Sequence, residues 1–422
     1  MASKFEFQDF TQEELDAKLQ RYARLLVRKG CALREGQPLF VRASTDSKDF
    51  ARLVAQEAYA AGCKRVTVLW SDEKIGRMTY DHCPVEEFET TPEWSALLHN
   101  SMAEQGASVL TLEGSDPEGF KGIDPAKVMA NIIATHKACK PFYDHLDFGK
   151  TIWCIAGAAT PAWAAKVFPD DAPDVALRRL WAAILHTARA DGDDPEAAWD
   201  AHNASFNRRK EIMNGHRFDK LHYTNSLGTD LTVGMTKGHI WHGGADVTVD
   251  GRTFFPNMPT EEIYTSPDNR RVDGIIYSAL PLINQGNIID RFWIRFEKGE
   301  VVDYGAEVGY EFLKGIIETD EGSKRLSETA LVPFSSPINQ TGILFYSTLY
   351  DENAVCHVAL GKGFPDCLEG GREMDDAQLR EAGLNTSATH VDFMIGTDDL
   401  SIVGTTESGE EIEIFESGQW AF

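Results

Sequence analysis

Four short apolar runs, separated by helical patterns, constrain the fold of the first half of this chain. Residues 65–70 read Arg-Val-Thr-Val-Leu-Trp, and comparable runs occupy residues 38–42, 108–112 and 151–156. Strands that are apolar on both faces are typical of a parallel sheet covered by helices on both sides. The pattern therefore predicts an α/β N-terminal domain with a mostly parallel sheet.

Beyond about residue 210 the pattern changes to alternating strands joined by turns. The stretch 221–235, Leu-His-Tyr-Thr-Asn-Ser-Leu-Gly-Thr-Asp-Leu-Thr-Val-Gly-Met, is one example, and helices are expected only near 309–320 and 375–381. A chain of 422 residues is too long for one ordinary core. We expect an α/β scaffold domain over residues 1–210 and a strand-rich α+β domain over residues 211–422.

Composition excludes several classes of partner. The net charge of −25 argues against binding nucleic acid or an anionic membrane surface. No apolar run reaches the roughly 20 residues of a membrane span, and the acidic N-terminus lacks the features of a signal peptide. The 7 cysteines are scattered without a C-x-x-C pair, which favours reduced thiols and a cytoplasmic protein.

Two short motifs in the first half give only weak evidence for a nucleotide or calcium site. The turn at residues 156–161, Ala-Gly-Ala-Ala-Thr-Pro, has one glycine, and no G-x-G-x-x-G or Walker lysine motif follows a predicted strand. The acidic turn at residues 191–194 lacks the spacing of a calcium loop and fits a helix N-cap better. The parallel sheet is therefore expected to be a scaffold rather than a nucleotide site.

His390-Val391-Asp392 carries the strongest chemical signal in the second half. On a strand, His390 and Asp392 share one face while Val391 and Phe393 pack behind them. A nitrogen and an oxygen ligand side by side suit zinc, cobalt or manganese. A simple hydrogen-bonded His–Asp pair is the competing interpretation.

Three further residues complete a set of metal-ligand types: Glu262, Glu328 and His357. Two imidazoles and three carboxylates are what a pair of divalent ions needs to activate water. His357 would also fit as a core histidine, because its neighbours are apolar. Glu328 stands in an apolar run, where a carboxylate is rarely buried without a partner or an ion.

Several strings in this half resemble the aminopeptidase T family of metallo-aminopeptidases, which includes enzymes of the AmpS and PepS type. They are Pro-Thr-Glu-Glu at 259–262, Leu-Ser-Glu-Thr-Ala-Leu-Val at 326–332, Asp-Glu-Asn-Ala at 351–354 and His-Val-Asp-Phe-Met-Ile-Gly at 390–396. The resemblance implies a cytoplasmic homodimer that uses two divalent metal ions (zinc, cobalt, manganese or magnesium). It also implies peptide substrates with leucine or another apolar or aromatic N-terminal residue. The metal ligands that it implies are Glu262, Glu328, His357, His390 and Asp392.

One position departs from the family pattern. The family commonly has a catalytic tyrosine seven residues after the first ligand histidine, where this chain has Phe364. A phenylalanine cannot donate a hydrogen bond to an oxyanion. Either another donor replaces it, such as Tyr346 or Tyr350, or the metal ions alone stabilise the transition state.

The catalytic general base is predicted less directly. Glu261 is the candidate because it adjoins a ligand, although on a strand it would face away from Glu262 and be solvated. His239 and His242 form an H-x-x-H, but three residues apart on a strand their rings would not share a face.

Two other functions stay open at this point. His357, His390 and Asp392 alone would suit a mononuclear iron ring-cleaving dioxygenase, although Glu262 and Glu328 would then fill positions that substrate and oxygen need. The missing tyrosine also leaves room for an inactive peptide-binding homologue.

Overall fold

A computed structural model describes residue 7 and residues 10–284 and 286–422 of the chain. The described chain forms two units. The first, here called the N-terminal unit, comprises residues up to 201 together with 245–259, and the second, the C-terminal unit, comprises residues 202–244 and 260–422. The predicted fold class is confirmed: the first unit is α/β with a parallel sheet, and the second is strand-rich.

The N-terminal unit is built on a five-stranded parallel sheet with the strand order β10-β4-β3-β1-β2. Leu39, Phe40 and Val41 on β1, which lies between β3 and β2, are completely buried, as expected for a strand covered on both faces. The strands are β1 (Pro38–Ser44), β2 (Arg65–Ser71), β3 (Ser108–Glu113), β4 (Trp153–Gly157) and β10 (Asn257–Met258).

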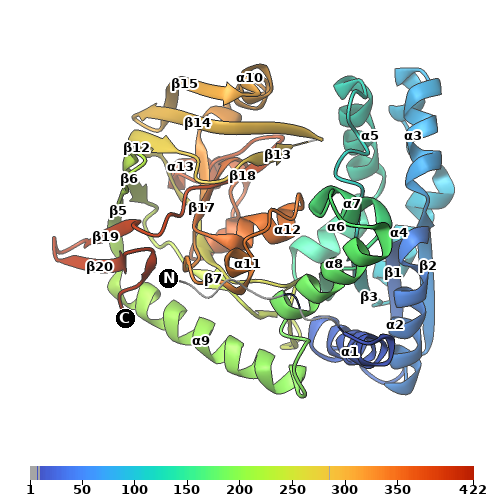
Figure 1. The fold of residues 1–422 in the computed structure, drawn as a ribbon. Helices are drawn as coiled ribbons and strands as arrows, with labels where there is room; N and C mark the ends of the chain where they lie inside the picture. Colours follow the sequence, from blue (N-terminus) through green and yellow to red (C-terminus); the bar gives the residue numbers. More distant parts are fainter. Residues whose placement is uncertain (1–6, 8–9, 285) are drawn as a thin grey trace. The chain divides into compact units, whose positions relative to one another are not determined.

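Helices, drawn from blue to green, pack around these strands (Figure 1). They are α1 (Gln12–Leu25), α2 (Lys48–Ala60), α3 (Glu73–His82), α4 (Glu93–Glu104), α5 (Pro125–Ala138), α6 (Lys140–Asp147), α7 (Pro161–Val167) and α8 (Pro173–Thr187). The turn after β4 serves as a helix cap, because the Thr160 side chain accepts a hydrogen bond from the Trp163 amide. Asp194 likewise accepts one from the Ala197 amide at the start of α9 (Pro195–His216). None of the described helices has both the length and the apolar composition of a membrane span.

The division between the units differs from the predicted boundary near residue 210. It falls within α9, and residues 245–259 then return to the N-terminal unit. They form the small hairpin of β8 (Asp246–Val247) and β9 (Thr253–Phe254), followed by β10, which pairs in parallel with β4. Strands of two residues are too short to produce a periodic pattern, so this return has no sequence signal.

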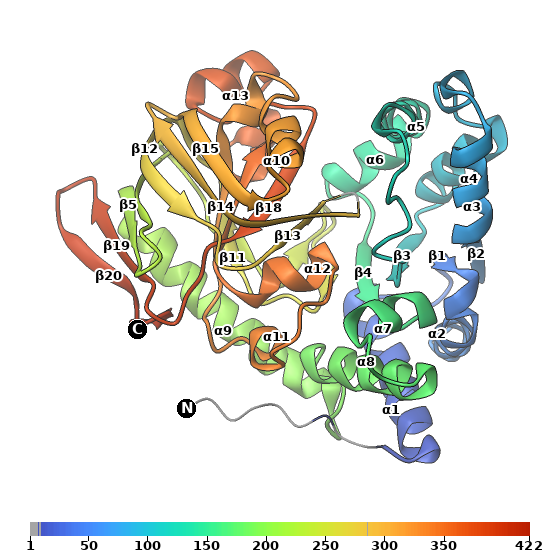
Figure 2. The same ribbon diagram turned by 45° about the horizontal axis from the view of Figure 1, so that its top comes forward.

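The C-terminal unit contains two larger antiparallel sheets (Figure 2). The five-stranded sheet has the order β18-β17-β16-β11-β7, and the other has the order β13-β14-β12-β6-β5-β19-β20-β21, with β15 paired to β14. The five-stranded sheet comprises β7 (His242–Gly243), β11 (Ile263–Thr265), β16 (Leu326–Leu331), β17 (His357–Gly361) and β18 (His390–Met394).

The second sheet of this unit supports the first through a shared core. Its strands are β5 (Phe218–Thr224), β6 (Asp230–Met235), β12 (Pro267–Tyr277), β13 (Leu282–Asn284), β14 (Asn287–Glu297), β15 (Glu300–Val308), β19 (Ser401–Thr406), β20 (Glu411–Glu416) and β21 (Gln419–Trp420). Helices α10 (Tyr310–Ile317) and α13 (Asp376–Ala382) lie where helices were predicted, and α11 (Pro337–Gln340) and α12 (Thr348–Asp351) are single turns. Buried side chains of both sheets, including Leu221, Val233, Leu326 and Val358, form one hydrophobic cluster.

Gly361 at the end of β17 lies where the backbones of two neighbouring strands approach closely. Its φ is +113°, and an added Cβ would lie 2.1 Å from the carbonyl oxygen of Thr389, which directly precedes the neighbouring strand β18. We expect Gly361→Ala to lower the free energy of unfolding by about 3 kcal/mol, because steric overlap with backbone adds to backbone strain. Chemical denaturation of parent and variant would measure this loss.

Gly409 is the matched control, since its φ is +86° and nothing lies within 4 Å of an added Cβ. Gly409→Ala should cost only about 1 kcal/mol, from backbone strain alone. Equal losses for both variants would contradict the tight fit at Gly361.

Candidate metal centre

The pairing register of three strands selects one face of the five-stranded sheet for polar side chains. Glu328 on β16 is opposite Ala359 on β17, and Ala359 is opposite Asp392 on β18. Directly paired residues point to the same face of a sheet, as do residues two positions apart on one strand. His357 and His390 therefore share this face with Glu328 and Asp392.

The opposite face of the same strands packs into the core. Val358, Leu360 and Phe393 belong to the buried cluster, alternating with the polar residues along β17 and β18. A register shift on β16 places Leu326 opposite Leu360 but Glu328 opposite Ala359, so Ser327 is the extra residue of a β-bulge. The bulge turns Leu326 toward the core and Glu328 toward the polar face.

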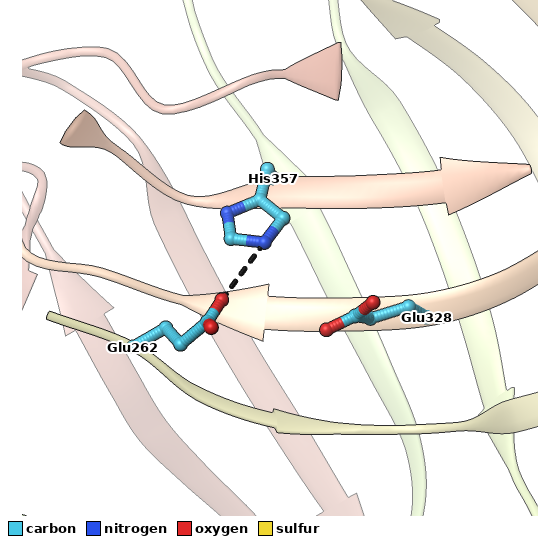
Figure 3. Close-up of side chains that lie close together, drawn as sticks. All are labelled: Glu262, Glu328 and His357. Carbon is cyan, nitrogen blue, oxygen red and sulfur yellow. Dashed lines mark ion pairs between the residues drawn. The ribbon is translucent and has the colours of Figure 1, made fainter. Parts of the chain in front are cut away.

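Glu262 reaches this face from the neighbouring strand. It directly precedes β11, whose Ile263 pairs with Leu331 of β16 and is itself buried in the core. Figure 3 shows Glu262, Glu328 and His357 pointing toward one another from three adjacent strands. The structure thus brings together all five residues that were predicted as metal ligands.

The five side chains form two groups of three that share Glu328. One consists of Glu262, Glu328 and His357, and the other of Glu328, His390 and Asp392; in each group the ligand atoms lie within 4.8 Å of one another. The Nε2 atom of His357 is 3.0 Å from Glu262 Oε2. The Nε2 atom of His390 is 3.0 Å from Glu328 Oε2 and 3.2 Å from Asp392 Oδ1.

Both imidazoles are oriented by backbone carbonyl groups. The Nδ1 atom of His390 lies 2.7 Å from the Lys362 carbonyl oxygen, and Nδ1 of His357 lies 3.4 Å from the Val355 carbonyl oxygen. A carbonyl only accepts hydrogen bonds, so Nδ1 carries a proton and donates it. Each Nε2 atom then faces the carboxylates, and release of its proton would free a lone pair for a metal ion.

Burial and mutual charge shift the proton affinities of the cluster. Burial opposes protonation of His357, but the hydrogen bond and negative charge of Glu262 prevail and raise its pKa to about 10. Burial and the charge of Asp392 raise the pKa of Glu328 to about 6, against the opposing effect of His390. For Asp392, burial is outweighed by the charge of His390, so its pKa is lowered.

The residues present fit a bound cation. Among the described residues, none provides a hydrogen bond in good geometry to the buried Oδ1 atom of Asp392. His390 Nε2 is its ion-pair partner at 3.2 Å, but the poor alignment of that contact leaves the buried charge only partly compensated, and a metal ion would relieve the remaining cost. The set of imidazole nitrogens and carboxylate oxygens suits zinc, cobalt or manganese.

Glu352 is a fourth acidic side chain at the cluster, and the sequence analysis missed it. Burial, followed by the charges of Asp392 and Glu262, raises its pKa well above the ordinary value. The Asn353 side-chain amide donates a hydrogen bond to Glu352 Oε1 at 3.3 Å. Glu352 stands five residues before His357 in a turn without periodicity, and its place in the string Asp-Glu-Asn-Ala at 351–354, which carries the family resemblance, was the signal that could have found it.

Glu261 lies apart from the ligand groups. Its carboxylate Oε2 is 3.7 Å from His202 Nε2, and its backbone amide donates to Asn353 Oδ1 at 2.7 Å. The expectation that the Glu261 side chain is solvated was wrong, because Glu261 is only 3% exposed. The cause is α9, which carries His202 and covers this segment.

The H-x-x-H histidines do not join the ligand groups found among the described residues. His242 Nε2 lies 2.8 Å from the Asp366 carbonyl oxygen, and His239 Nδ1 lies 2.9 Å from the Thr236 carbonyl oxygen. Both rings are therefore engaged by backbone groups.

Phe364 lies beside the cluster, with its ring centroid 4.9 Å from that of His390 and 5.7 Å from that of Tyr264. Tyr350, one of the two tyrosines that could replace the missing hydroxyl group, is completely buried and stacks on Phe345, with ring centroids 4.5 Å apart. A hydroxyl without solvent access cannot meet a substrate in this conformation. Tyr346 has a left-handed backbone, with φ of +57°, in the loop before α12.

Comparisons with known proteins agree with this site. Residues 15–420 match the family model described as thermophilic metalloprotease (M29). Aminopeptidase AmpS of Bacillus subtilis (strain 168) is 42% identical over 97% of this chain and 100% of its own length. Aminopeptidase T of Thermus thermophilus is 40% identical over 95% of this chain and 98% of its own length.

A solved structure extends the similarity to three dimensions. Wild-type AmpT from Thermus thermophilus superposes with a TM-score of 0.90 at 37% identity, covering 97% of this chain and 100% of the other. Neither the iron dioxygenase nor an inactive peptide-binding homologue finds support in these matches. The chain therefore belongs to the M29 family of metalloproteases and is a metallo-aminopeptidase.

Proposed function

We propose that this aminopeptidase works with two divalent ions and releases leucine and other apolar or aromatic residues from the N-termini of peptides. The observation that carries the proposal is the sharing of Glu328 between two groups of three ligands. A carboxylate has two oxygens, so one Glu328 side chain can serve two cations at once. The removal of N-terminal residues follows from the relatives, which are aminopeptidases, and the preference for leucine and other apolar or aromatic residues rests on the resemblance to the aminopeptidase T family.

Glu262 and His357 would hold one ion, His390 and Asp392 the other, and Glu328 both. Bound zinc, cobalt, manganese or magnesium would activate water and polarise the peptide carbonyl. The Lys362 and Val355 carbonyl groups keep each imidazole in the tautomer that presents Nε2. The core face of the sheet holds the strands in register, so the ligand atoms stay close together without a bound ion.

Glu352 is the better candidate for the general base. Its carboxyl group interacts electrostatically with Asp392, Glu262 and Glu328, whereas Glu261 is engaged by His202. A raised pKa suits a group that must take a proton from water and deliver it to the leaving amine. We therefore assign the proton transfer to Glu352 and a structural role to Glu261.

We also propose that the protein is a cytoplasmic homodimer. All 7 cysteines are free thiols in the structure, which fits a reducing compartment.

The dimer has its own support on the surface of α3 and α4. Four apolar side chains there are 59–67% exposed, and exposed apolar side chains of this size favour association. They are Ile75, Met78, Trp94 and Leu97. Light scattering at micromolar concentration should give twice the 46.9 kDa chain mass, and a monomer mass would refute the dimer.

The proposed function predicts hydrolysis of leucine p-nitroanilide at a rate above those of charged aminoacyl p-nitroanilides. The purified chain would be stripped with a chelator and reloaded with zinc, cobalt, manganese or magnesium. Elemental analysis of the most active form should give two ions per chain. No release of p-nitroaniline with any metal, or a single bound ion, would refute the proposal.

In the same assay, Glu328→Gln should lower kcat by roughly a hundredfold or more and reduce the metal content, because a neutral amide cannot serve two cations. Glu321→Gln is the matched control, since the Glu321 side chain is 90% exposed. Retention of activity in the Glu328 variant would exclude its shared role.

Exchange of each candidate base for glutamine should separate their roles. We expect Glu352→Gln to lower kcat by about 100-fold to 10,000-fold with two ions still bound, because general acid–base catalysis typically contributes this much. Glu261→Gln should leave kcat within a few-fold of the parent and lower the melting temperature instead. The opposite pattern would restore Glu261 as the base.

A further inference from the structure

Tyr264 lies on the polar face of the five-stranded sheet. It is the central residue of β11, paired with Ala330 of β16 on one side and with His242 of β7 on the other. Ala330 is also paired with His357 and is two residues from Glu328. By alternation Tyr264 shares the face of these ligand residues, while its neighbour Ile263 points into the core.

A row of aromatic rings connects Tyr264 to one group of ligands. Its ring meets Phe364 edge to face, with centroids 5.7 Å apart and planes at 68°. The Phe364 ring in turn lies 4.9 Å from His390. These contacts fix the phenol ring beside the metal centre without using its hydroxyl group.

The hydroxyl group of Tyr264 is not used in the hydrogen-bond network of the described residues. The side chain is partly exposed, and no hydrogen bond joins its hydroxyl to another described residue. A structural tyrosine behaves differently: the buried Tyr223 exchanges a hydrogen bond with Thr329 Oγ1 at 2.5 Å. The described residues give the Tyr264 hydroxyl no hydrogen-bond partner, so it is available to a molecule outside the chain, such as water or a substrate.

The chemistry of the surrounding side chains defines what that partner would be. Glu262, Glu328 and Asp392 only accept hydrogen bonds when they are ionised, and Phe364 has no polar atom. A substrate carbonyl oxygen that gains negative charge needs a donor, and the phenol is protonated at neutral pH. Tyr264 adds a neutral hydrogen-bond donor to this face, beside carboxylates that can only accept.

We propose that the Tyr264 hydroxyl donates a hydrogen bond to the carbonyl oxygen of the scissile peptide as that oxygen becomes negatively charged. This role rests on the proposed function, because it presupposes attack of water on the carbonyl carbon at the metal centre. Tyr264 forms no covalent bond and keeps its proton throughout. It is a catalytic residue in the sense that its hydroxyl touches the reacting oxygen.

Steady-state kinetics on leucine p-nitroanilide would compare the parent with Tyr264→Phe. The variant should show kcat lowered by about a hundredfold, KM changed less than threefold and two ions per chain retained, since the bond forms mainly in the transition state. Tyr277→Phe on β12, in the other sheet, is the matched loss of a hydroxyl and should behave as the parent. A kcat for Tyr264→Phe within threefold of the parent would overturn the proposal.

Phe364→Tyr provides a second test, because the rings at 264 and 364 are in contact. In the Tyr264→Phe background it should raise kcat at least tenfold, while in the parent, which already has a donor, it should raise kcat less than threefold. Equal increases in both backgrounds would show that Tyr264 does not address this oxygen.

Binding of inhibitors separates this role from the proposed function itself. A phosphonate analogue of leucine carries tetrahedral anionic oxygens, whereas free leucine does not. In titration calorimetry, Tyr264→Phe should weaken binding of the phosphonate at least tenfold and binding of free leucine less than twofold. Equal affinities of parent and variant for the phosphonate would refute the hydrogen bond from Tyr264. A parent without peptidase activity would refute the proposed function, and the two outcomes are independent of each other.

Discussion

Strand alternation across β16, β17 and β18 is the constraint on which the site depends. Val358, Leu360 and Phe393 anchor one face in the core, so the residues between them must point the other way. The bulge at Ser327 corrects the register of β16, which brings Glu328 to the polar face while Leu326 stays in the core. The apolar residues of each strand therefore set the direction of the candidate ligand side chains. These side chains need no contact with one another to be placed on the polar face.

Burial of several carboxylates on one face creates an electrostatic problem that the fold does not solve alone. Hydrogen bonds from the two histidines compensate part of the negative charge, and the raised pKa values of His357, Glu328 and Glu352 show that protons would compensate the rest. Divalent cations would replace those protons, which is why binding of metal ions to such sites releases protons. The same charges that make the cluster unfavourable without cations are thus the source of its affinity for them.

The sequence predicted the parts of the molecule that depend on periodicity or on residue type. The parallel strands of the first half were predicted because both of their faces are apolar. His390 and Asp392 were predicted as metal ligands from strand alternation, and Glu262, Glu328 and His357 from residue type and the family resemblance; the structure brings the five together, and their role as ligands stays a prediction. Glu352 was missed because it belongs to a helical turn, Glu352–Ala354, that has no periodic pattern. The solvated state expected for Glu261 was wrong because α9, about 60 residues earlier in the chain, supplies the covering side chain His202. The return of β10 to the parallel sheet rests on two residue pairs, which no sequence pattern reveals.

The small side chain of Ala359 explains how ligands from three strands can converge. Ala359 stands in the middle row of the site, between Glu328 on one side and Asp392 on the other. A larger side chain there would occupy the space into which the two carboxylates must lean. With alanine, the centre of the row stays open at the level of Cβ, and the longer side chains from β16 and β18 can meet above β17. The small residue at the centre of β17 thus leaves the space in which cations would bind. His357, the candidate ligand on this strand, stands at its start, where it is opposite Ala330 rather than a second charged residue.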